Sequence, residues 1–434
     1  MSNDLNDPTP EAGAPRRRLL SRRRFLTLCL GGTTASFAGS VTWLNYVPAP
    51  TPVKDVPLSD AARALIAKAW EGLDPAKVVD VHAHVIGLGV GDTGCQVHAD
   101  NFSWTSPVRM AKTRFYKGAA GIYDESQADA LYLQRLLDLA QTQSPRGRML
   151  LLAFDHHHDH EGTPRPEVSE FYTPNDYVAQ IVKDHPELFL FCCSIHPYRA
   201  DALDELDRCV ELGAKCVKWL PNAMGIDPLD ERCLPFYERM ASHGLPLLTH
   251  AGEEQAVHAE EAQELGNPLR LRAPLEQGVT VLLAHCASLG TNADLDQDPA
   301  ADGSRPRESG FALFRRLAKE PRETGRLFAD ISATPQFNRC DPILAELLGD
   351  PQLHPLLING SDYPLPAIDL IIRTGQLAGL GLLDPAEVPL LEEVFAHNPL
   401  LFDFVLKRRL RVVTDAGEQR FPASVYETAH LFER

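Results

Sequence analysis

Apolar runs alternate with amphipathic stretches along most of the chain. Eight runs have the composition of strands that are buried on both faces. They are KVVDVHAH from Lys77, RMLLLAFD from Arg148, LFLFCCSIHP from Leu188, AKCVKWLP from Ala214, LPLLTHAG from Leu245, VTVLLAHC from Val279, RLFADISA from Arg326 and HPLLINGSDYP from His354. Intervening segments such as TPNDYVAQIVKDHPE and ADALDELDRCVELG have apolar residues at helical spacing and end near proline or glycine. The pattern predicts parallel strands connected by helices.

Eight strand–helix units fit the α/β class, as a (β/α)8 TIM barrel with loop insertions. An open doubly wound sheet is the alternative, but the first strand ends in histidines where a glycine-rich phosphate-binding turn would stand. The longest insertions follow the first strand, at residues 85–147, and the sixth strand, at residues 286–325. We expect residues 56–434 to form the barrel domain.

Composition and charge limit the kinds of molecule that the protein can be expected to bind. The 434 residues are 44% hydrophobic, enough for a sizeable core, and carry a formal charge of -17. Nucleic-acid binding is excluded because the dense basic cluster lies only at the N-terminus. The nine cysteines are spread singly apart from Cys192 and Cys193, with no C-x-x-C pair. We expect buried small hydrophobic cysteines rather than disulfides.

The N-terminal cluster resembles an export signal. SRRRFLT, at residues 21–27, matches the twin-arginine pattern, and an uncharged apolar stretch continues to Val47. VPAPTPVKDVP then reads as a linker. Residues 1–55 are therefore expected to be a signal or anchor plus linker, read by the twin-arginine export machinery and directing the protein to the periplasm or cell envelope. Residues 25–47 are long enough for a retained membrane anchor. A basic tail before a buried helix is the alternative.

Two histidines stand at the end of the first predicted strand. His82 and His84 are two residues apart, so they share one face of the strand, with Asp80 on the same side. Such a pair can bind one metal ion, although an isolated H-x-H is more often a hydrogen-bonded pair in a loop.

Other strands end in metal-capable residues as well. His250 ends the fifth run, His285 the sixth and Asp362 the eighth. Singly, each would be a packed core histidine or a turn residue. In a barrel, however, these ends converge on one rim, where active sites of this fold lie. Three imidazoles and a carboxylate match a zinc-type site with room for water.

The motifs as a set resemble the amidohydrolase superfamily, in the amidohydrolase-related group that includes aminocarboxymuconate-semialdehyde decarboxylase. The resemblance covers about residues 76–410. It rests on VDVHAH, GAKCVKWLPN, LPLLTHAGE, VLLAHCASLG, FADISA, INGSDYP and HNPLLFDFVL. It implies that His82, His84, His250 and Asp362 bind the metal. It also implies that His285 lies beside the metal-bound water or the negative charge that develops on the substrate.

Lys218 bears on the number of metal ions. It lies near the end of the fourth strand, on the face opposite to Lys215. In binuclear relatives a lysine at this place is carboxylated and bridges two ions. The alternative is a cation that pairs with Asp362 or with a substrate carboxylate. We expect one divalent ion, zinc, and two ions only if Lys218 is carboxylated.

The ligand set implies a hydrolase that uses metal-activated water on an amide, lactone or ester of a small molecule. Asp362 would take a proton from the water and pass it to the leaving group, and His285 would stabilise the oxyanion. A metal-dependent decarboxylase and a noncatalytic metal-binding envelope protein are the alternatives. An oligomer is compatible with the sequence.

Several polar residues and segments on the expected rim of the barrel have more than one possible role. DHHHDHEG, at residues 155–162, is interpreted as an auxiliary metal site, a lid or a solvated loop. Glu253, Glu254 and Arg199 are candidate substrate contacts. The acidic segment that begins at Asn292 is expected to be an exposed, mobile insertion.

Overall fold

The computed structural model of the chain describes residues 57–257, 259–320, 325–415 and 417–433. The expected export signal, anchor and linker at residues 1–55 lie outside these residues. Within the described part of the chain, no helix has the length and apolar composition needed to cross a membrane.

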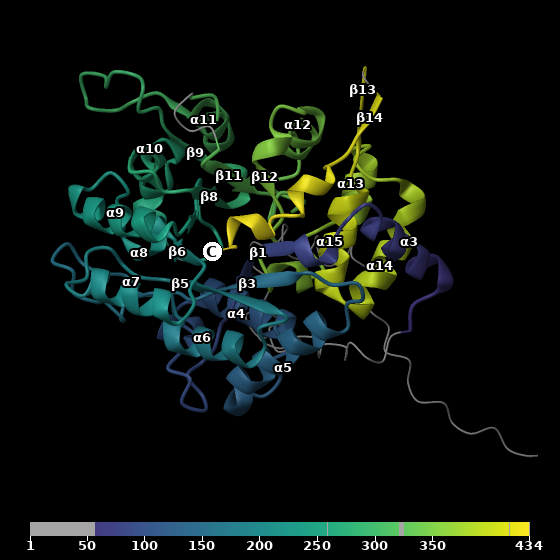
Figure 1. Cartoon of the computed structure of the whole chain (residues 1–434), viewed down its shortest axis with the longest axis horizontal. Coiled ribbons are helices and arrows are strands. Elements are labelled where there is room, and N and C mark those ends of the chain that lie inside the picture. Colours follow the sequence, from purple (N-terminus) through teal and green to yellow (C-terminus); the bar gives the residue numbers. More distant parts are fainter. Residues whose placement is uncertain (1–56, 258, 321–324, 416, 434) are drawn as a thin grey trace, which may run out of the picture. The chain divides into compact units, whose positions relative to one another are not determined.

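An eight-stranded parallel sheet forms the centre of the domain (Figure 1). In spatial order its strands are β1 (Val79–His84), β3 (Arg148–Leu152), β5 (Phe189–Cys193), β6 (Cys216–Trp219), β7 (Leu247–Thr249), β8 (Val281–Leu283), β11 (Leu327–Asp330) and β12 (Leu357–Ile358). Val81 donates to the Asn359 carbonyl at 3.0 Å and His84 donates to the Tyr363 carbonyl at 2.9 Å. These bonds join β1 to the segment after β12 and close the sheet into a barrel. The predicted barrel is confirmed, with one strand in each of the eight apolar runs.

Helices surround the strands (Figure 1). They are α3 (Asp60–Trp70), α4 (Pro107–Ala119), α5 (Ala128–Gln141), α6 (Asn175–Asp184), α7 (Ala202–Glu211), α8 (Pro221–Met224), α9 (Leu234–His243), α10 (Arg272–Glu276), α11 (Gly310–Leu317), α12 (Ile343–Gly349), α13 (Thr374–Gly379), α14 (Val388–His397) and α15 (Pro399–Arg409). The segments with helical spacing form α6 and α7, as predicted. The insertion after β1 is not one long loop, because it contains α4 and α5.

Three short antiparallel pairs lie outside the barrel. They are β2 (Gln96–Val97) with β4 (Phe171–Tyr172), β9 (Thr291–Ala293) with β10 (Arg307–Ser309), and β13 (Val412–Thr414) with β14 (Gly417–Gln419). The acidic insertion after β8 is the hairpin of β9 and β10, and most of the residues between these strands are exposed, as expected.

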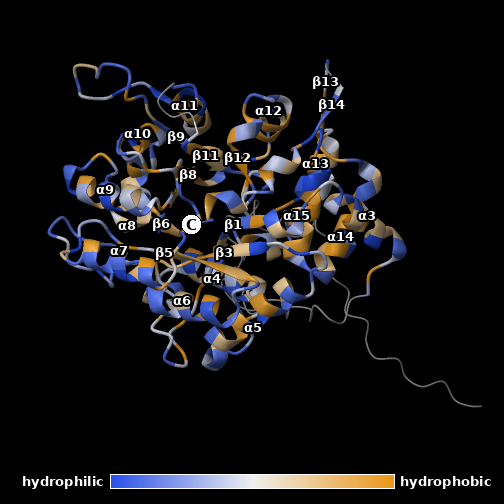
Figure 2. Cartoon of the chain, in the orientation of Figure 1, coloured by the Kyte–Doolittle hydropathy of each residue, from blue (hydrophilic) through white to orange (hydrophobic). Residues whose placement is uncertain are grey.

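The barrel interior is filled by apolar side chains of every central strand except β11, whose Phe328 is partly buried against them. Ala429 and Phe432 of the C-terminal segment belong to the same cluster. Tyr426 accepts a hydrogen bond from the N–H of Val79, the first residue of β1, at 3.2 Å. The C-terminal segment therefore covers the amino ends of the strands, which leaves the carboxyl ends for a site. Figure 2 shows hydrophobic residues along β3 and β5 and hydrophilic residues on outward-facing helix surfaces.

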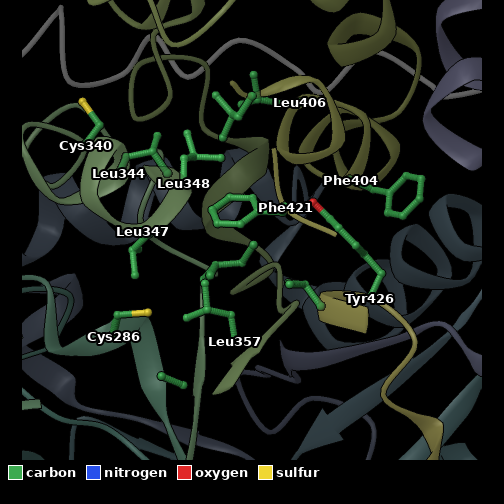
Figure 3. Packing of buried hydrophobic residues seen from close by; sticks show 14 of the residues in the cluster. Cys286, Cys340, Leu344, Leu347, Leu348, Leu357, Phe404, Leu406, Phe421 and Tyr426 are labelled. Atoms are coloured by element: carbon green, nitrogen blue, oxygen red, sulfur yellow. The ribbon is translucent and has the colours of Figure 1, made fainter. Parts of the chain in front are cut away.

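A second apolar layer packs the helices against the barrel. Leu344, Leu347 and Leu348 of α12 pack in one cluster with Leu357 of β12 and with Phe404 of α15 (Figure 3). The start of α15 follows from its sequence, because the Asn398 side chain accepts from the N–H groups of Leu400 and Leu401 and a proline stands at the first helical position.

The cysteines behave as small hydrophobic residues. All eight in the described part of the chain are buried and none of them forms a disulfide there, as predicted. Cys29 lies outside the described residues.

Candidate metal centre

The carboxyl ends of the barrel strands bring three predicted metal-binding side chains together. His82 Nε2 and His84 Nε2 lie 3.3 Å apart, and Asp362 Oδ1 lies 3.6 Å from the first and 3.3 Å from the second. Two ligands that are each about 2.1 Å from a tetrahedral ion lie about 3.4 Å from one another. The three atoms therefore have the spacing of ligands around one metal ion.

A bulge in β1 decides which side chains share this site. The pairing of β1 with β3 shifts its register after Asp80. Val79 and Val81 pack in the barrel interior, while Asp80 lines a cavity against α15. The prediction that Asp80 lies on the same side as the two histidines is wrong, because the bulge interrupts the alternation of side chains.

Asp330, at the end of β11, connects two of the site histidines, and the sequence analysis missed it. Its Oδ2 accepts from His82 Nδ1 at 2.9 Å, and its Oδ1 accepts from the His285 backbone N–H at 3.0 Å and from the Ser332 hydroxyl. The Ser332 oxygen accepts from His285 Nδ1 at 2.6 Å. With Nδ1 protonated, each neutral ring has its lone pair on Nε2. His82, His285 and Asp330 also form a group with donor atoms within 4.8 Å.

His250 reaches the same region from the end of β7, but it belongs to neither compact group of donor atoms. The centroid of its ring lies 5.3 Å from that of His285. Its Nδ1 lies 3.3 Å from Glu254 Oε2, and its Nε2 is buried without a hydrogen-bond partner among the described residues. Such a buried nitrogen is costly unless a ligand meets it, so its free lone pair fits a metal-binding role. Glu254, a candidate substrate contact, lies beside this imidazole, and its role toward a substrate stays a prediction.

Burial favours the neutral form of three of the site histidines. It lowers the pKa of His84, it lowers the pKa of His250 to about 4, and it lowers the pKa of His285 well below its ordinary value. Burial acts to raise the pKa of Asp362, but electrostatic attraction to His285 and His82 and a hydrogen bond with His84 outweigh burial and lower that pKa. The site thus offers neutral nitrogens and an ionised carboxylate, the forms that bind a divalent cation.

Backbone strain is concentrated at the same place. Asp362 has a φ of 62° and His285 a φ of 57°, values in the left-handed region that residues with side chains rarely adopt. Such conformations persist only where the surrounding structure holds them, and they cluster at functional sites. The strain therefore agrees with a functional role for both residues.

Lys218 lies beside the three converging atoms. Its Nζ is 3.2 Å from His82 Nε2, and its side chain is buried. Burial lowers its pKa, against the attraction of Asp330 and Asp362. A buried amine that is more easily deprotonated is compatible with either predicted role, the carboxylated ligand or the free cation.

Arg339, in the loop after β11, is a buried cation that the sequence analysis did not identify. The residue is 8% exposed, its Nη1 donates to Ser288 Oγ at 3.2 Å, and its Nε has no hydrogen-bond partner. No carboxylate of the described residues lies within 4.0 Å of it. Burial lowers its pKa although Glu254 and Asp362 attract the charge. Only the tertiary fold brings this loop arginine to the site, so its position in the sequence gives no signal.

The histidine-rich loop at residues 155–162 is held by hydrogen bonds to the backbone. His157 Nδ1 lies 3.0 Å from the Ala223 carbonyl, and His158 Nδ1 lies 3.0 Å from the His156 carbonyl. In the part of the chain that the structure describes, compact groups of three donor atoms involve the site residues above and not this loop. His156 and His157 are partly buried and His158 is buried, whereas His160 and Glu161 are exposed, so only the second half of the segment faces solvent.

Two further candidate substrate contacts are occupied within the protein. Arg199 pairs with Asp155 at 3.1 Å and with Asp201 at 2.8 Å. Glu253 accepts from the side chain of Gln255 at 2.8 Å. The charge of Arg199 is therefore already paired with carboxylates, unlike that of Arg339, and a role of either residue toward a substrate stays a prediction.

A small apolar cavity of about 30 Å³ lies between the segment that follows β1 and α4, and none of the proposed metal ligands lines it. Ile86 and Leu88, which follow β1, line it together with Tyr116 of α4 and Pro364, two residues beyond Asp362. The insertion that contains α4 thus supplies one wall beside the rim of the barrel.

The chain is a TIM-barrel protein with side chains that can bind a metal ion at the carboxyl ends of its strands. Two of them are histidines on the first strand, and one is an aspartate after the last strand. Residues 79–334 match the protein family described as amidohydrolase. The match spans more than half of the 434 residues, so the chain belongs to the amidohydrolase family, as the sequence motifs implied. A comparison with curated proteins found no match.

Solved structures similar to this chain include three of interest. An uncharacterized TIM-barrel protein from Bordetella bronchiseptica has 15% identity and a TM-score of 0.43, covering 76% of this chain and 99% of that one. A 5-carboxyvanillate decarboxylase from Sphingomonas paucimobilis has 11% identity and a TM-score of 0.43, covering 83% and 99%. A 4-oxalomesaconate hydratase from Rhodopseudomonas palustris has 12% identity and a TM-score of 0.40, covering 82% and 95%. The fold assignment rests on the strand order rather than on these likenesses.

Proposed function

We propose that this chain is a metal-dependent hydrolase that acts on an amide, lactone or ester. The observation that carries the proposal is the convergence of His82 Nε2, His84 Nε2 and Asp362 Oδ1 at 3.3 to 3.6 Å. The unpaired His250 Nε2 supports a fourth ligand. We propose one ion, zinc, since nitrogen ligands and a carboxylate suit it, and a second ion only if Lys218 is carboxylated.

A divalent cation held by these residues would supply Lewis acidity, which would polarise a carbonyl and lower the pKa of water so that hydroxide is available near neutral pH. Asp362 Oδ2 lies 3.9 Å from His285 Nε2, so both groups can take part in moving a proton from the attacking water to the leaving group. Because His285 Nδ1 donates to Ser332, the neutral ring accepts a proton on Nε2. Once protonated, His285 stabilises the oxyanion or returns the proton to the leaving group.

The substrate is proposed to carry a carboxylate. Arg339 is a buried guanidinium with a neutral partner on Nη1 and an unpaired Nε. Buried charges are normally paired, so an anion beside the metal centre is the expected partner.

Decarboxylation is the second candidate, and the same observation favours it. A substrate carboxylate held between Arg339 and the metal centre could also be the group that is lost as carbon dioxide. The two reactions differ in the fate of water, since hydrolysis adds it to the products and decarboxylation does not.

The test is an activity screen on carboxylated lactones, amides and aromatic acids in labelled water. Labelled water oxygen in the organic product supports the hydrolase, and carbon dioxide release without labelled oxygen in the organic product supports the lyase. His285→Asn is the matched control, because it removes the proton acceptor and leaves every proposed ligand in place. We expect it to retain metal and lose turnover. Failure of the parent, with metal bound, to turn over any substrate class would favour a noncatalytic metal-binding protein.

The N-terminal motif supports a proposal for the cellular compartment in which the protein acts. SRRRFLT followed by an apolar stretch supports export by the twin-arginine machinery to the periplasm or cell envelope, with or without a retained anchor at residues 25–47.

A further inference from the structure

The turn after β12 carries Asp362 in a conformation that its surroundings must hold. Its φ of 62° lies in the strained left-handed region. At Gly360, two residues earlier, a Cβ would stand 2.7 Å from the Cβ of His82. The turn is thus in close contact with one proposed ligand and carries another. A small displacement of its backbone would move Asp362 relative to His82.

Hydrogen bonds from two layers of the protein hold this turn. Asp362 donates to the His82 carbonyl at 2.7 Å, and Ser361 donates to Asp80 Oδ1 at 2.8 Å, so both of these bonds run to β1. Lys407 Nζ donates to the Gly360 carbonyl at 2.6 Å. Lys407 lies on α15, so this bond ties the turn to the helical layer outside the barrel.

Lys407 is a costly residue at this place. It is completely buried, and its Nζ also donates to Asp403 Oδ2 at 2.6 Å, where Asp403 is itself buried. Helix α15 also contributes apolar side chains such as Phe404 and Leu406 to the core (Figure 3). An apolar pair of similar size would avoid the desolvation penalty of a buried ion pair. The pair with Asp403 alone therefore gives no reason for a lysine. Its ammonium group also attracts the Asp80 carboxylate, which accepts from Ser361, and donates to Gly360, so both of these interactions act on the turn.

We propose that Lys407 is a positioning residue for the metal centre. Its ammonium group fixes the Gly360 carbonyl and thereby the place of Asp362, and Asp403 holds the ammonium group and balances its charge. This inference rests on the proposed function, because it requires that Asp362 binds metal. Lys407 itself touches neither metal nor substrate.

The test separates positioning from stability with three variants of the full chain. Lys407→Met removes the bond to Gly360 and leaves Asp403 unpaired. Lys407→Met combined with Asp403→Leu removes both charges, so that the stability of the barrel recovers while the bond to Gly360 stays absent. Arg409→Met is the matched control. Arg409 lies two residues further along α15, is buried, and pairs with Glu387 at 2.6 Å rather than with the turn.

The readouts are the dissociation constant for Zn²⁺, measured by competition with a chelator, and the melting temperature of the metal-free protein. We expect both Lys407 variants to bind Zn²⁺ about 10- to 100-fold more weakly than the parent, the range found when residues behind metal ligands are removed. The double variant should melt near the parent. Arg409→Met should melt lower and bind Zn²⁺ as the parent does.

Parent-like Zn²⁺ affinity in the double variant would overturn the inference, and this variant decides the question even if Lys407→Met does not fold. Equal weakening in Arg409→Met would also overturn it, because the effect would then follow from lost stability. Failure of the proposed function looks different, since the parent itself would not bind Zn²⁺.

Discussion

Replacing Arg339 by methionine is expected to make the protein more stable and less able to bind carboxylates. The residue is 8% exposed, and its guanidinium has Ser288 Oγ as a partner at 3.2 Å and an unpaired Nε. Burial lowers its pKa despite the attraction of Glu254 and Asp362, so the charge is held at a net cost. Methionine should fill most of the volume. We expect a gain of about 1 kcal/mol in the free energy of unfolding, or roughly 1–2 °C in melting temperature for a domain of this size.

The effect on ligand binding should have the opposite sign. A carboxylate at 100 times its dissociation constant stabilises the parent by about 2.7 kcal/mol. Hydrogen bonds to a charged group contribute about 1.5–3 kcal/mol, so losing Arg339 should weaken binding roughly 10- to 150-fold. At the same carboxylate concentration the variant would then be stabilised by only about 0.3–1.4 kcal/mol.

The assay is scanning calorimetry of the zinc-loaded protein with a panel of mono- and dicarboxylates, and with the matching primary amides as controls. Arg339→Lys, which keeps a positive charge, should retain part of the carboxylate shift. A melting temperature several degrees below that of the parent in Arg339→Met would show that the arginine supports the fold. An unchanged carboxylate shift in that variant would refute its role in recognition.

Three other predictions concern metal number, export and acid stability. Lys218→Ala should keep about one metal ion per chain by elemental analysis; two ions in the parent, falling on mutation and restored by short carboxylic acids, would point to a carboxylated lysine. Replacing Arg22 and Arg23 by lysines should block export in a cell-fractionation assay, because a receptor reads the motif, and undiminished export would indicate another route. Burial lowers the pKa of His196 from 6.5 to about 2, so below pH 6.5 the unfolded chain takes up a proton that the folded protein does not, and stability falls with pH. His196→Gln should therefore reduce the slope of unfolding free energy between pH 6 and 4 by about 1.4 kcal/mol per pH unit, and an unchanged slope would contradict this.

The barrel itself was predictable because its strands are buried on both faces. Runs such as LFLFCCSIHP are apolar throughout, and the two helical segments quoted with them have clear periodicity. Strand ends also predicted where His250, His285 and Asp362 lie, since parallel strands in a barrel present their carboxyl ends on one rim.

What could not be predicted depends on local irregularity or on long-range contact. A bulge in β1 turns Asp80 toward α15, and the alternation of side chains in the sequence gives no sign of an inserted residue. Arg339 reaches the site from a loop, and its proposed role in binding a carboxylate follows from the lack of a carboxylate partner among the described residues. Asp330 did have a signal, because it ends the seventh apolar run as the recognised residues end theirs.

The account is tested most directly by metal analysis of the purified parent beside His82→Ala and Asp362→Ala. Each substitution removes a proposed ligand from the rim without emptying the apolar core, so both variants should keep the circular dichroism spectrum of the parent. We predict about one divalent ion per chain in the parent and a loss of metal and activity in both variants. Metal content and turnover that are unaltered in both folded variants would contradict the assignment of this site.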